Sequence, residues 1–394
     1  MPRLLHMADI HLGARHDDLG PAAAAQRERQ FDAFKRSIDL AIAEKVDLVL
    51  ICGDLFDSNS QPRRSFERAA AELGRLAQRH IPVVAIPGTH DCYDAASIYR
   101  VFDLAELSGA PADSGLVTLL TDTKSSIDFA DLGITVRAKV FPTKRGGESP
   151  MAALTVSADD PSVKAGNWQV GMVHGSFAIP GLFDSDDVSF TEAEVAATNL
   201  DYLALGHWHS FRDGRAGNTT RAYSGAPEPV ALDQDGAGQV ALVTLEGGAG
   251  QRRVTVEART VGRTRFHRQE IDAAAVHSQA ELEAKLRESA NPDLVLDVRV
   301  VGVRAAELDL NVDELERQLA SAFMRVRVRD LSIAPLDDGL VAPPDTVLGA
   351  FVRNFQAGIE EDETAGNAER AAERREALHL GLLLLDDPQR VTLA

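Results

Sequence analysis

The sequence predicts an α/β protein of two or three domains, and three observations support this fold class. The chain has 394 residues, and one domain usually holds roughly 150 residues. In the first 210 residues, short runs rich in Val, Ile and Leu alternate with amphipathic stretches, a pattern typical of buried, largely parallel strands joined by helices. Hydrophobic residues make up 44% of the chain and charged residues 26%, which is ordinary for a folded globular protein.

The first domain is expected over residues 1–250. Five apolar runs that each end in a polar or glycine-bearing segment predict strands at 3–10, 47–52, 81–86, 168–173 and 201–205. Apolar residues that recur every three or four positions predict helices at 27–45 and 63–80. Shorter strands are expected at 116–120, 126–129, 133–141 and 240–245, before the glycine-rich segment 247–250 that is expected to end the domain.

A second, smaller α/β domain is expected over residues 251–335. Strands are predicted at 254–258, 294–301 and 325–329, and helices are predicted to begin after Ser278 and after Asn311, each with a glutamate three residues later. Prolines at positions 335, 343 and 344 indicate a linker. Residues 336–394 are therefore expected to form a linker and a helical tail, whose amphipathic part is 368–385.

Composition excludes some classes of protein and leaves one question open. Cys52 and Cys92 are the only cysteines, so a disulfide scaffold is excluded and a reducing cytoplasm is expected. No apolar run reaches the roughly 18 residues of a membrane helix, so we expect no membrane span. The net charge of −19 counts against a nucleic-acid partner, although six arginines lie within residues 252–268 against one acidic residue. A solvent-exposed strand face is the simpler explanation of that basic run.

Histidine and aspartate side chains collect where the predicted strands end. The set comprises Asp9, His11, Asp54, His90, His174, His207 and His209. Any one of them alone would more commonly be a surface or hydrogen-bonding residue, but their recurrence at five strand ends of one domain indicates a metal site. Carboxylates and imidazoles without a thiolate suit manganese, iron or zinc. A carboxylate shared by two ions would give a two-metal centre that can bind a phosphoryl group.

The motifs in this series resemble those of the calcineurin-like metallophosphoesterase superfamily. Within it, the segments 6–13 (HMADIHLG), 53–57 (GDLFD) and 206–209 (GHWH) look most like the SbcD-type DNA double-strand-break repair nucleases, as does 223–228 (YSGAPE). The resemblance implies a four-layer fold, a β-sandwich flanked by helices. The small α/β domain matches the capping domain of that family in position and size.

The resemblance also implies roles for single residues. The implied metal ligands are Asp9, His11 and His209 for one ion, His174 and His207 for the other, and Asp54 as the bridge between them. His90 would contact the scissile phosphate and help the leaving oxygen depart. Asp57 stands where related enzymes keep a carboxylate that orients this histidine, and a plain helix-entry role is the alternative. Thr89 replaces the usual asparagine ligand of the second ion, so we expect the second site either to bind metal more weakly or to use water in place of the amide.

The leading functional hypothesis is a manganese-dependent DNA exonuclease and endonuclease that hydrolyses phosphodiester bonds with metal-activated water. The resemblance implies an SbcC-type ABC ATPase as partner and a homodimer. Segment 95–107 is a candidate dimer helix, and the tail is a candidate docking element for the ATPase. The candidate DNA contacts are Arg252, Arg253, Arg263 and Arg265. A small-molecule phosphodiesterase or phosphatase, which the overall acidity favours, and a scaffold subunit that lost turnover at Thr89 remain alternatives.

Overall fold

Two six-stranded sheets lie at the centre of the first unit of the computed structural model, Met1–Phe266, and a second unit comprises His267–Ala394. The structure describes residues 1–143, 148–177, 188–231, 234, 236–248, 251–305, 307–333, 343 and 345–386. All the strands predicted within the first 210 residues are present, each within a few residues of its expected bounds.

The first sheet has a parallel centre and an antiparallel edge. Its strands, in spatial order, are β14 (Arg253–Thr260), β13 (Gln239–Glu246), β1 (Arg3–Met7), β2 (Leu48–Cys52), β3 (Val83–Ile86) and β4 (Val117–Leu119). The strands from β1 to β4 run parallel, and β13 lies antiparallel to β1. Every residue of β2 is buried, as expected for a parallel strand that is covered on both faces.

The second sheet repeats this plan. Its strands, in spatial order, are β11 (Arg212–Ala216), β12 (Thr219–Tyr223), β10 (Tyr202–Gly206), β7 (Trp168–His174), β6 (Ile134–Ala138) and β5 (Ser126–Phe129). The four central strands are parallel and both edge strands are antiparallel to their neighbours. A separate pair, β8 (Ser176–Phe177) and β9 (Ser189–Phe190), follows β7.

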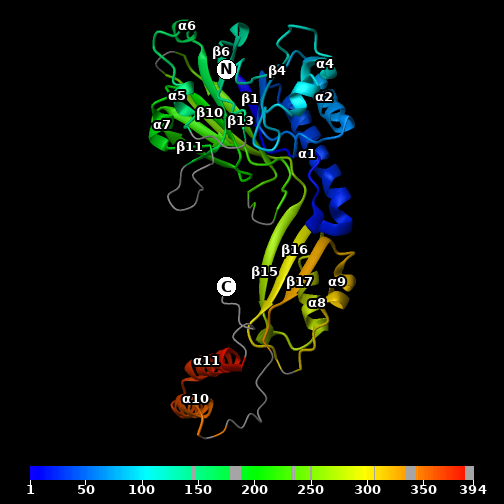
Figure 1. The fold of residues 1–394 in the computed structure, drawn as a ribbon, viewed down its shortest axis with the longest axis vertical. Coiled ribbons are helices and arrows are strands. Elements are labelled where there is room, and N and C mark those ends of the chain that lie inside the picture. The colour runs from blue at the N-terminus through cyan, green and yellow to red at the C-terminus, as the bar shows by residue number, and fades with distance from the viewer. Residues whose placement is uncertain are drawn as a thin grey trace. The chain divides into compact units, whose positions relative to one another are not determined.

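Helices cover the outer face of each sheet, so the unit has four layers. The first sheet packs against α1 (Ala23–Ala43), α2 (Arg63–Ala77) and α4 (Leu104–Ser108). The other flank carries α5 (Met151–Leu154), α6 (Pro161–Lys164) and α7 (Glu192–Ala196), as Figure 1 shows. A separate buried cluster that includes Leu50, Val170 and Ala204 fills the space between the two sheets. This arrangement confirms the predicted metallophosphoesterase sandwich.

The first unit ends later in the chain than expected. The strand predicted at 254–258 is β14, and it pairs with β13 over eight residues, from Gln239 with Thr260 to Glu246 with Arg253. Gly247, the first residue of the glycine-rich segment, directly follows β13 and has the left-handed φ of 89° that suits a turn. The compact unit extends to Phe266 instead of ending at residue 250.

The candidate dimer helix at 95–107 is two short helices. α3 (Ile98–Val101) ends at Phe102, whose backbone is extended, and Asp103 caps α4 by accepting hydrogen bonds from two backbone N–H groups. The cap starts a new helix because its carboxylate satisfies donors that a continuous helix would have bonded internally.

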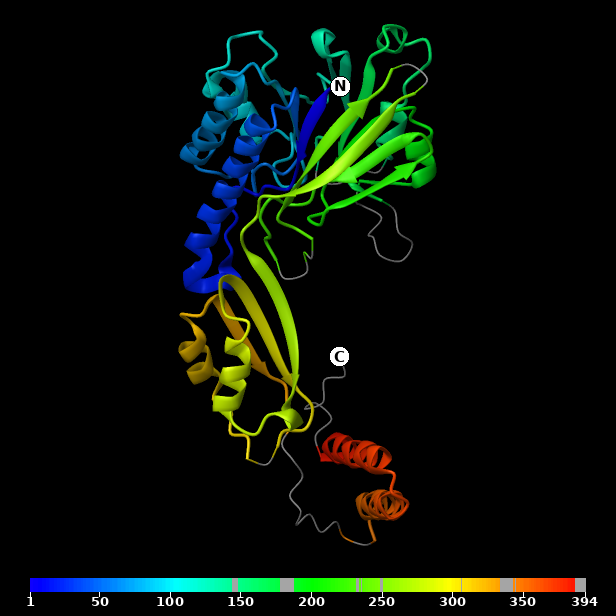
Figure 2. The same ribbon diagram turned by 180° about the vertical axis from the view of Figure 1, so that it is seen from behind.

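The second unit contains a three-stranded sheet with helices on one face (Figure 2). Its strands are β15 (Arg265–Asp272), which leads in from the first unit, β16 (Asn291–Val301) and β17 (Phe323–Asp330); its helices are α8 (Gln279–Arg287) and α9 (Val312–Leu319). Both helices begin at the predicted caps, Ser278 and Asn311. Leu282, Leu315 and Val298 belong to its buried core.

The tail forms a helical hairpin. The amphipathic stretch predicted at 368–385 is α11 (Ala368–Asp386), whereas α10 (Val347–Thr364) had no predicted counterpart. The two helices pack together through Val352, Ile359 and Leu378. None of the helices in the described part of the chain is long and apolar enough to cross a membrane.

Candidate metal centre

The candidate ligands gather where β1, β2, β3, β7 and β10 end. Hydrogen bonds between backbones hold the first two of these loops together, because the Asp9 N–H donates to Gly53 O (3.1 Å) and the His11 N–H to Asp54 O (2.9 Å). Parallel strands place their carboxyl ends at one edge of a sheet, so loops distant in sequence meet there.

Four of the candidate residues adopt a backbone conformation that is unusual for residues with a side chain. The φ angles are 54° at Asp9, 49° at His11, 50° at Asp54 and 99° at His207. Such conformations cost roughly 1–3 kcal/mol each and persist where the surrounding structure enforces them, as it does at functional sites. Local sequence preference would not select these backbones, so tertiary contacts must hold them.

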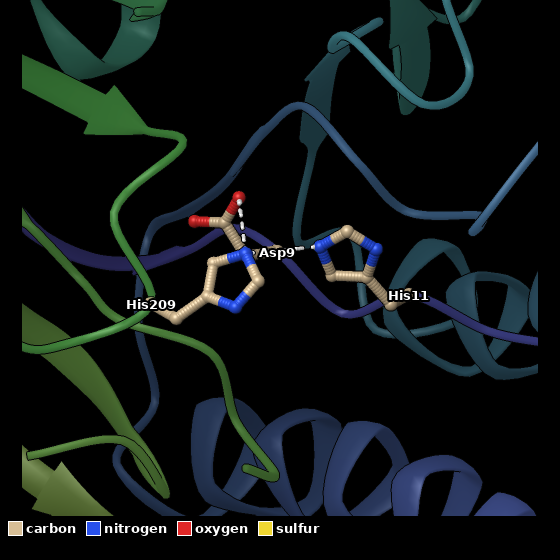
Figure 3. Close-up of side chains that lie close together, drawn as sticks. All are labelled: Asp9, His11 and His209. Atoms are coloured by element: carbon tan, nitrogen blue, oxygen red, sulfur yellow. Dashed lines mark hydrogen bonds and ion pairs between the residues drawn. The ribbon is translucent and has the colours of Figure 1, made fainter. Parts of the chain in front are cut away.

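Asp9, His11 and His209 point toward one another (Figure 3). The Nε2 atoms of His11 and His209 lie 3.2 Å apart, and His209 Nε2 lies 4.0 Å from Asp9 Oδ1. Facing imidazole nitrogens 3.2 Å apart can share one proton at most, whereas a cation between them would bind both lone pairs. This donor set fits a divalent metal ion.

Asp54 lies between these residues and a second group. Its Oδ2 atom is 3.1 Å from His174 Nε2 and 3.8 Å from His11 Nε2. The other carboxylate oxygen accepts a hydrogen bond of 2.7 Å from the His90 N–H, and the Thr89 hydroxyl lies 3.4 Å from Oδ2. Burial would raise the pKa of this carboxyl, but the neighbouring imidazoles outweigh burial and hold the pKa well below its usual range. Asp54 therefore stays ionised, as a bridging ligand must.

His174 presents one defined nitrogen to Asp54. Its Nδ1–H donates to the backbone oxygen of Cys52 at 2.9 Å, which leaves Nε2 to face the carboxylate. Burial acts to lower the pKa of His174, yet Asp54 and Asp9 raise this pKa to about 10. In the metal-free protein the ring is therefore protonated, and a metal ion would take the place of that proton.

Three glycines leave room for this arrangement. A Cβ atom on Gly206 would lie 1.9 Å from Cys52 O and 2.7 Å from His174 Nδ1, and one on Gly53 would lie 2.3 Å from the same nitrogen. A Cβ atom on Gly88 would lie 2.3 Å from Asp54 Oδ1. The glycines next to the motifs therefore serve close approach of the backbone to the ligands.

His207 approaches the cluster in a different way. Its backbone N–H donates to both oxygens of Asp9 at 3.0 Å, and its ring lies edge-on to His174 with a centroid distance of 5.3 Å. Its side chain does not belong to any of the three ligand groups that the described residues form. The structure thus brings His207 to the site, with its backbone N–H on Asp9 and its ring beside His174.

The structure changes the expected role of Asp57. Its carboxylate lies 3.2 Å from His11 Nδ1 and 3.7 Å from His90 Nδ1, and the group that accepts from His90 Nδ1 is the Asp57 backbone oxygen (2.9 Å). Asp57 therefore orients His90 through its backbone and His11 through its carboxylate. It does not cap a helix either, since α2 begins at Arg63.

His90 is half exposed, with 49% of its side chain accessible. A carbonyl oxygen can only accept, so Nδ1 carries the proton that is donated to Asp57 O. Nε2 is then the nitrogen that can interact with a substrate.

Asp91 and Tyr99 were not identified from the sequence, yet they fix the loop that carries Thr89 and His90. The buried Asp91 carboxylate accepts from the N–H groups of Gly88 (2.7 Å) and Phe56 (3.1 Å) and from the Tyr99 hydroxyl (2.5 Å). The only signal in the sequence was the position of Asp91 directly after the Gly-x-His motif.

The candidate DNA-binding arginines do not form one surface. Arg252 donates to Asp201 and to Gly166 O, both at 2.6 Å, and stacks on Trp168. It lies with Arg253 at the start of β14, the end of the sheet away from the ligands. Arg263 and Arg265 follow β14 at the other end. Arg252 is thus occupied in the fold, which argues against a DNA contact through this residue.

Comparison with known proteins agrees with this geometry, in which carboxylates and imidazoles converge at the strand ends of an α/β sandwich. The profile named calcineurin-like phosphoesterase matches residues 2–211, more than half of the chain. The chain belongs to this family.

Among curated proteins, the chain is similar to two proteins named DNA double-strand break repair protein Mre11. The one from Aeropyrum pernix is 29% identical over 255 residues, which cover 63% of this chain and 59% of that protein. The one from Halobacterium salinarum is 25% identical over 396 residues, with coverage of 96% and 95%. The chain thus spans less than two thirds of the first relative's length. A solved dimetal phosphatase from Danio rerio is 12% identical with a TM-score of 0.39, over 66% of this chain and 99% of that one.

Proposed function

We propose that the protein is a divalent-metal-dependent DNA nuclease that acts in double-strand-break repair. The observation that carries this proposal is the convergence of Asp9, His11, Asp54, His174 and His209 at the strand ends of a calcineurin-like phosphoesterase. The names of the curated relatives favour DNA over other phosphodiesters.

The proposed ligand assignment follows the two buried groups. Asp9, His11 and His209 would hold one ion, Asp54 and His174 the second, with Asp54 in reach of both. His207 would complete the second site by a change in its ring position, and the Thr89 hydroxyl is the remaining oxygen donor near Asp54. When bound, two divalent ions would supply a hydroxide nucleophile at neutral pH and neutralise the charge on the phosphate. We propose manganese as the ion.

His90 is proposed to act on the leaving oxygen. Because Nδ1–H is held by Asp57 O, the ring presents Nε2 to the substrate and in its protonated form can donate a proton or a hydrogen bond there. Removing such an acid typically lowers the rate by about 10²–10⁴-fold.

The test is a nuclease assay on single-stranded, duplex and hairpin DNA with manganese, magnesium or EDTA. Wild type is expected to cleave DNA with manganese and not in EDTA, and His90→Ala to lose at least a hundredfold in kcat with unchanged manganese affinity. His277→Ala is the matched control, because this exposed histidine lies in the second unit. DNA cleavage that His90→Ala leaves intact would overturn the role of His90 and point to a contaminating nuclease or to the scaffold alternative.

A small-molecule phosphodiesterase is the second candidate, and the net charge of −19 favours it. Hydrolysis of cyclic nucleotides without cleavage of any DNA would establish this alternative. Activity on a generic phosphodiester would not separate the two candidates.

We further propose that an SbcC-type ATPase binds the helical hairpin α10–α11 and that the nuclease forms a homodimer in the cytoplasm. Neither Cys52 nor Cys92 forms a disulfide, as expected for a reducing compartment. Capture of such an ATPase by the full chain, and loss of that capture when residues 341–394 are removed, would support the docking role.

Sedimentation analysis would test the proposed homodimer. Because the broken helix at 98–108 offers a short apolar face, dimerisation through it is the weaker of the two proposals.

A further inference from the structure

A small cavity lies beside the segments that carry His174, His207 and His209, since Phe177 and Trp208 line it. It has a volume of about 230 Å³. The residues that line it and matter here are Phe177, Trp208, Tyr223, Arg212, Arg221 and Glu192. The proposed hydrolysis does not use any of them.

Two of the aromatic side chains of the cavity, Trp208 and Tyr223, are fixed by hydrogen bonds. Trp208 Nε1–H donates to Ser176 Oγ at 2.9 Å, and the Tyr223 hydroxyl donates to Gly175 O at 3.0 Å. The ring of Tyr223 lies 6.0 Å from that of Trp208 and 6.2 Å from that of Phe177. The rings therefore form rigid walls that can receive a flat ligand without rearrangement.

A buried arginine forms one side of the cavity. The Arg221 guanidinium lies over the Phe177 ring at 4.2 Å, and its other face lies against Gly214, where a Cβ atom would come within 3.1 Å of it. Only 9% of the side chain is exposed, and Nε has no hydrogen-bond partner among the residues that the structure describes. A buried N–H of this kind usually has an acceptor, which a ligand would supply.

The charges favour a neutral ring over a phosphate. Arg221 is paired with Glu192 at 2.6 Å, and this carboxylate lines the same cavity. A phosphate would meet that carboxylate, whereas an uncharged base would stack on the aromatic rings and accept from Arg221. Aromatic rings beside a hydrogen-bond donor are surroundings in which proteins bind unstacked bases.

The cavity is linked to the metal centre by the chain itself. Trp208 stands between His207 and His209, and Phe177 follows His174 by three residues. We infer that this cavity binds a nucleobase next to the bond that is cut, so that the enzyme acts on an unpaired nucleotide. The catalytic part of this inference rests on the proposed function, whereas the binding part does not.

Trp208 offers a direct test of binding. The chain has two tryptophans, and the other, Trp168, lies under Arg252, so Trp168→Phe leaves Trp208 as the only tryptophan. Its fluorescence is followed in EDTA as deoxyadenosine 5′-monophosphate or deoxyribose 5-phosphate is added. We expect saturable quenching by the nucleotide and none by the sugar phosphate. Equal quenching by both would identify an anion site, and no quenching by the nucleotide would also overturn the inference.

Variants in the same background locate the binding site. Phe177→Leu removes a stacking ring, and we expect this variant to weaken nucleotide binding at least fivefold. Arg212→Gln removes a cation that lines the cavity. Arg215→Ala is the matched control, because this exposed residue lies on the same strand, β11, but lines a different cavity. Circular dichroism confirms folding of each variant. Unchanged binding in folded Phe177→Leu would contradict the assignment.

Cleavage of single-stranded DNA with one abasic site tests the catalytic part. For the wild type, the KM for cleavage of the bond beside the missing base should be higher than the KM for the same bond in the intact strand. Phe177→Leu should cut intact and abasic strands alike. If no DNA is cut but the nucleotide still quenches Trp208, the proposed function fails while the cavity assignment stands. If DNA is cut but quenching is absent, the base-binding inference alone fails.

Discussion

Thr89 is the residue at which this chain departs from the pattern of its family. Its hydroxyl lies 3.4 Å from Asp54 Oδ2, close enough to reach an ion beside that carboxylate but with a weaker donor than an amide oxygen. Thr89→Asn should therefore lower the manganese concentration for half-maximal activity, by about threefold or more. A metal titration of DNA cleavage measures this effect. An unchanged midpoint and rate would show that the residue at this position does not contribute to metal binding.

His6 gives the protein an acid-sensitive core. The residue is fully buried beside the Tyr202 hydroxyl (2.8 Å), and burial lowers its pKa to about 3. His6 takes up a proton near pH 6.5 in the unfolded chain but only near pH 3 in the folded chain. The folded state is therefore not penalised by His6 above pH 6.5, and it loses stability relative to the unfolded state as the pH decreases below 6.5. Between pH 7 and pH 5 the loss is about 2 kcal/mol for this one group.

The comparison with His6→Gln isolates this contribution. Urea unfolding at pH 7 and pH 5, in EDTA so that metal binding does not contribute, should show the larger decrease in unfolding free energy for the wild type. Parallel decreases in the two proteins would assign the acid sensitivity to other groups.

At the scale of elements, the loop between β3 and α3 depends on one buried carboxylate. Asp91 accepts three hydrogen bonds and so joins Gly88, Phe56 and Tyr99. Tyr99→Phe removes one of them and should cost about 1.5–3 kcal/mol of stability, as for other hydrogen bonds to charged groups. Since Thr89 and His90 lie in this loop, kcat should also fall while KM for DNA stays nearly constant.

Thermal unfolding and steady-state kinetics of Tyr99→Phe provide both readouts. Tyr93→Phe is the matched control, since its ring stacks with Arg100 and it lies outside the Asp91 network. A stability loss with an unchanged kcat would limit Asp91 and Tyr99 to a structural role.

At the scale of the whole molecule, metal binding should couple to folding. The ligands come from strands that are far apart in sequence, so the unfolded chain has no preformed site. Manganese at one hundred times its dissociation constant should stabilise the protein by about 2.7 kcal/mol, which raises the melting temperature of the first unit by about 5–10 °C. Differential scanning calorimetry measures this shift.

Asp54→Asn provides the contrast for that experiment. The variant loses the charge shared by both proposed ion sites, so manganese should shift its melting temperature much less. Asp128→Asn, on edge strand β5, is the control with a normal shift. An equal shift in Asp54→Asn and wild type would refute the ligand assignment, irrespective of any nuclease assay.

The charge of the whole chain also affects the proposed binding of DNA. A net charge of −19 predicts weak binding that decreases steeply with salt, although two bound divalent ions would make the catalytic surface locally positive. Arg252 is occupied by Asp201 and Gly166, so fewer arginines than the sequence offered are available for DNA. The acidity is therefore consistent with a partner that supplies part of the DNA affinity.

The sequence by itself determined the α/β class, the order of the strands along the chain and the residues at the strand ends. These features are local: a short apolar run rich in Val, Leu and Ile, such as Leu48–Cys52, is typical of a buried strand, and a polar residue directly after such a strand lies at the sheet edge. The helix caps at Ser278 and Asn311 were predictable for the same reason, because a cap is formed within four residues.

Only the tertiary structure decided which strands pair, where the first unit ends and which group contacts which histidine. The sequence could not show that β14 joins the first sheet, that Asp57 uses its carboxylate on His11 and its backbone on His90, or that Asp91 fixes the loop that carries Thr89 and His90. These outcomes depend on distances between segments that are far apart in the chain. The positive φ angles at Asp9, His11 and Asp54 have the same origin, because contacts between loops that are far apart in the chain hold backbones that local preference disfavours.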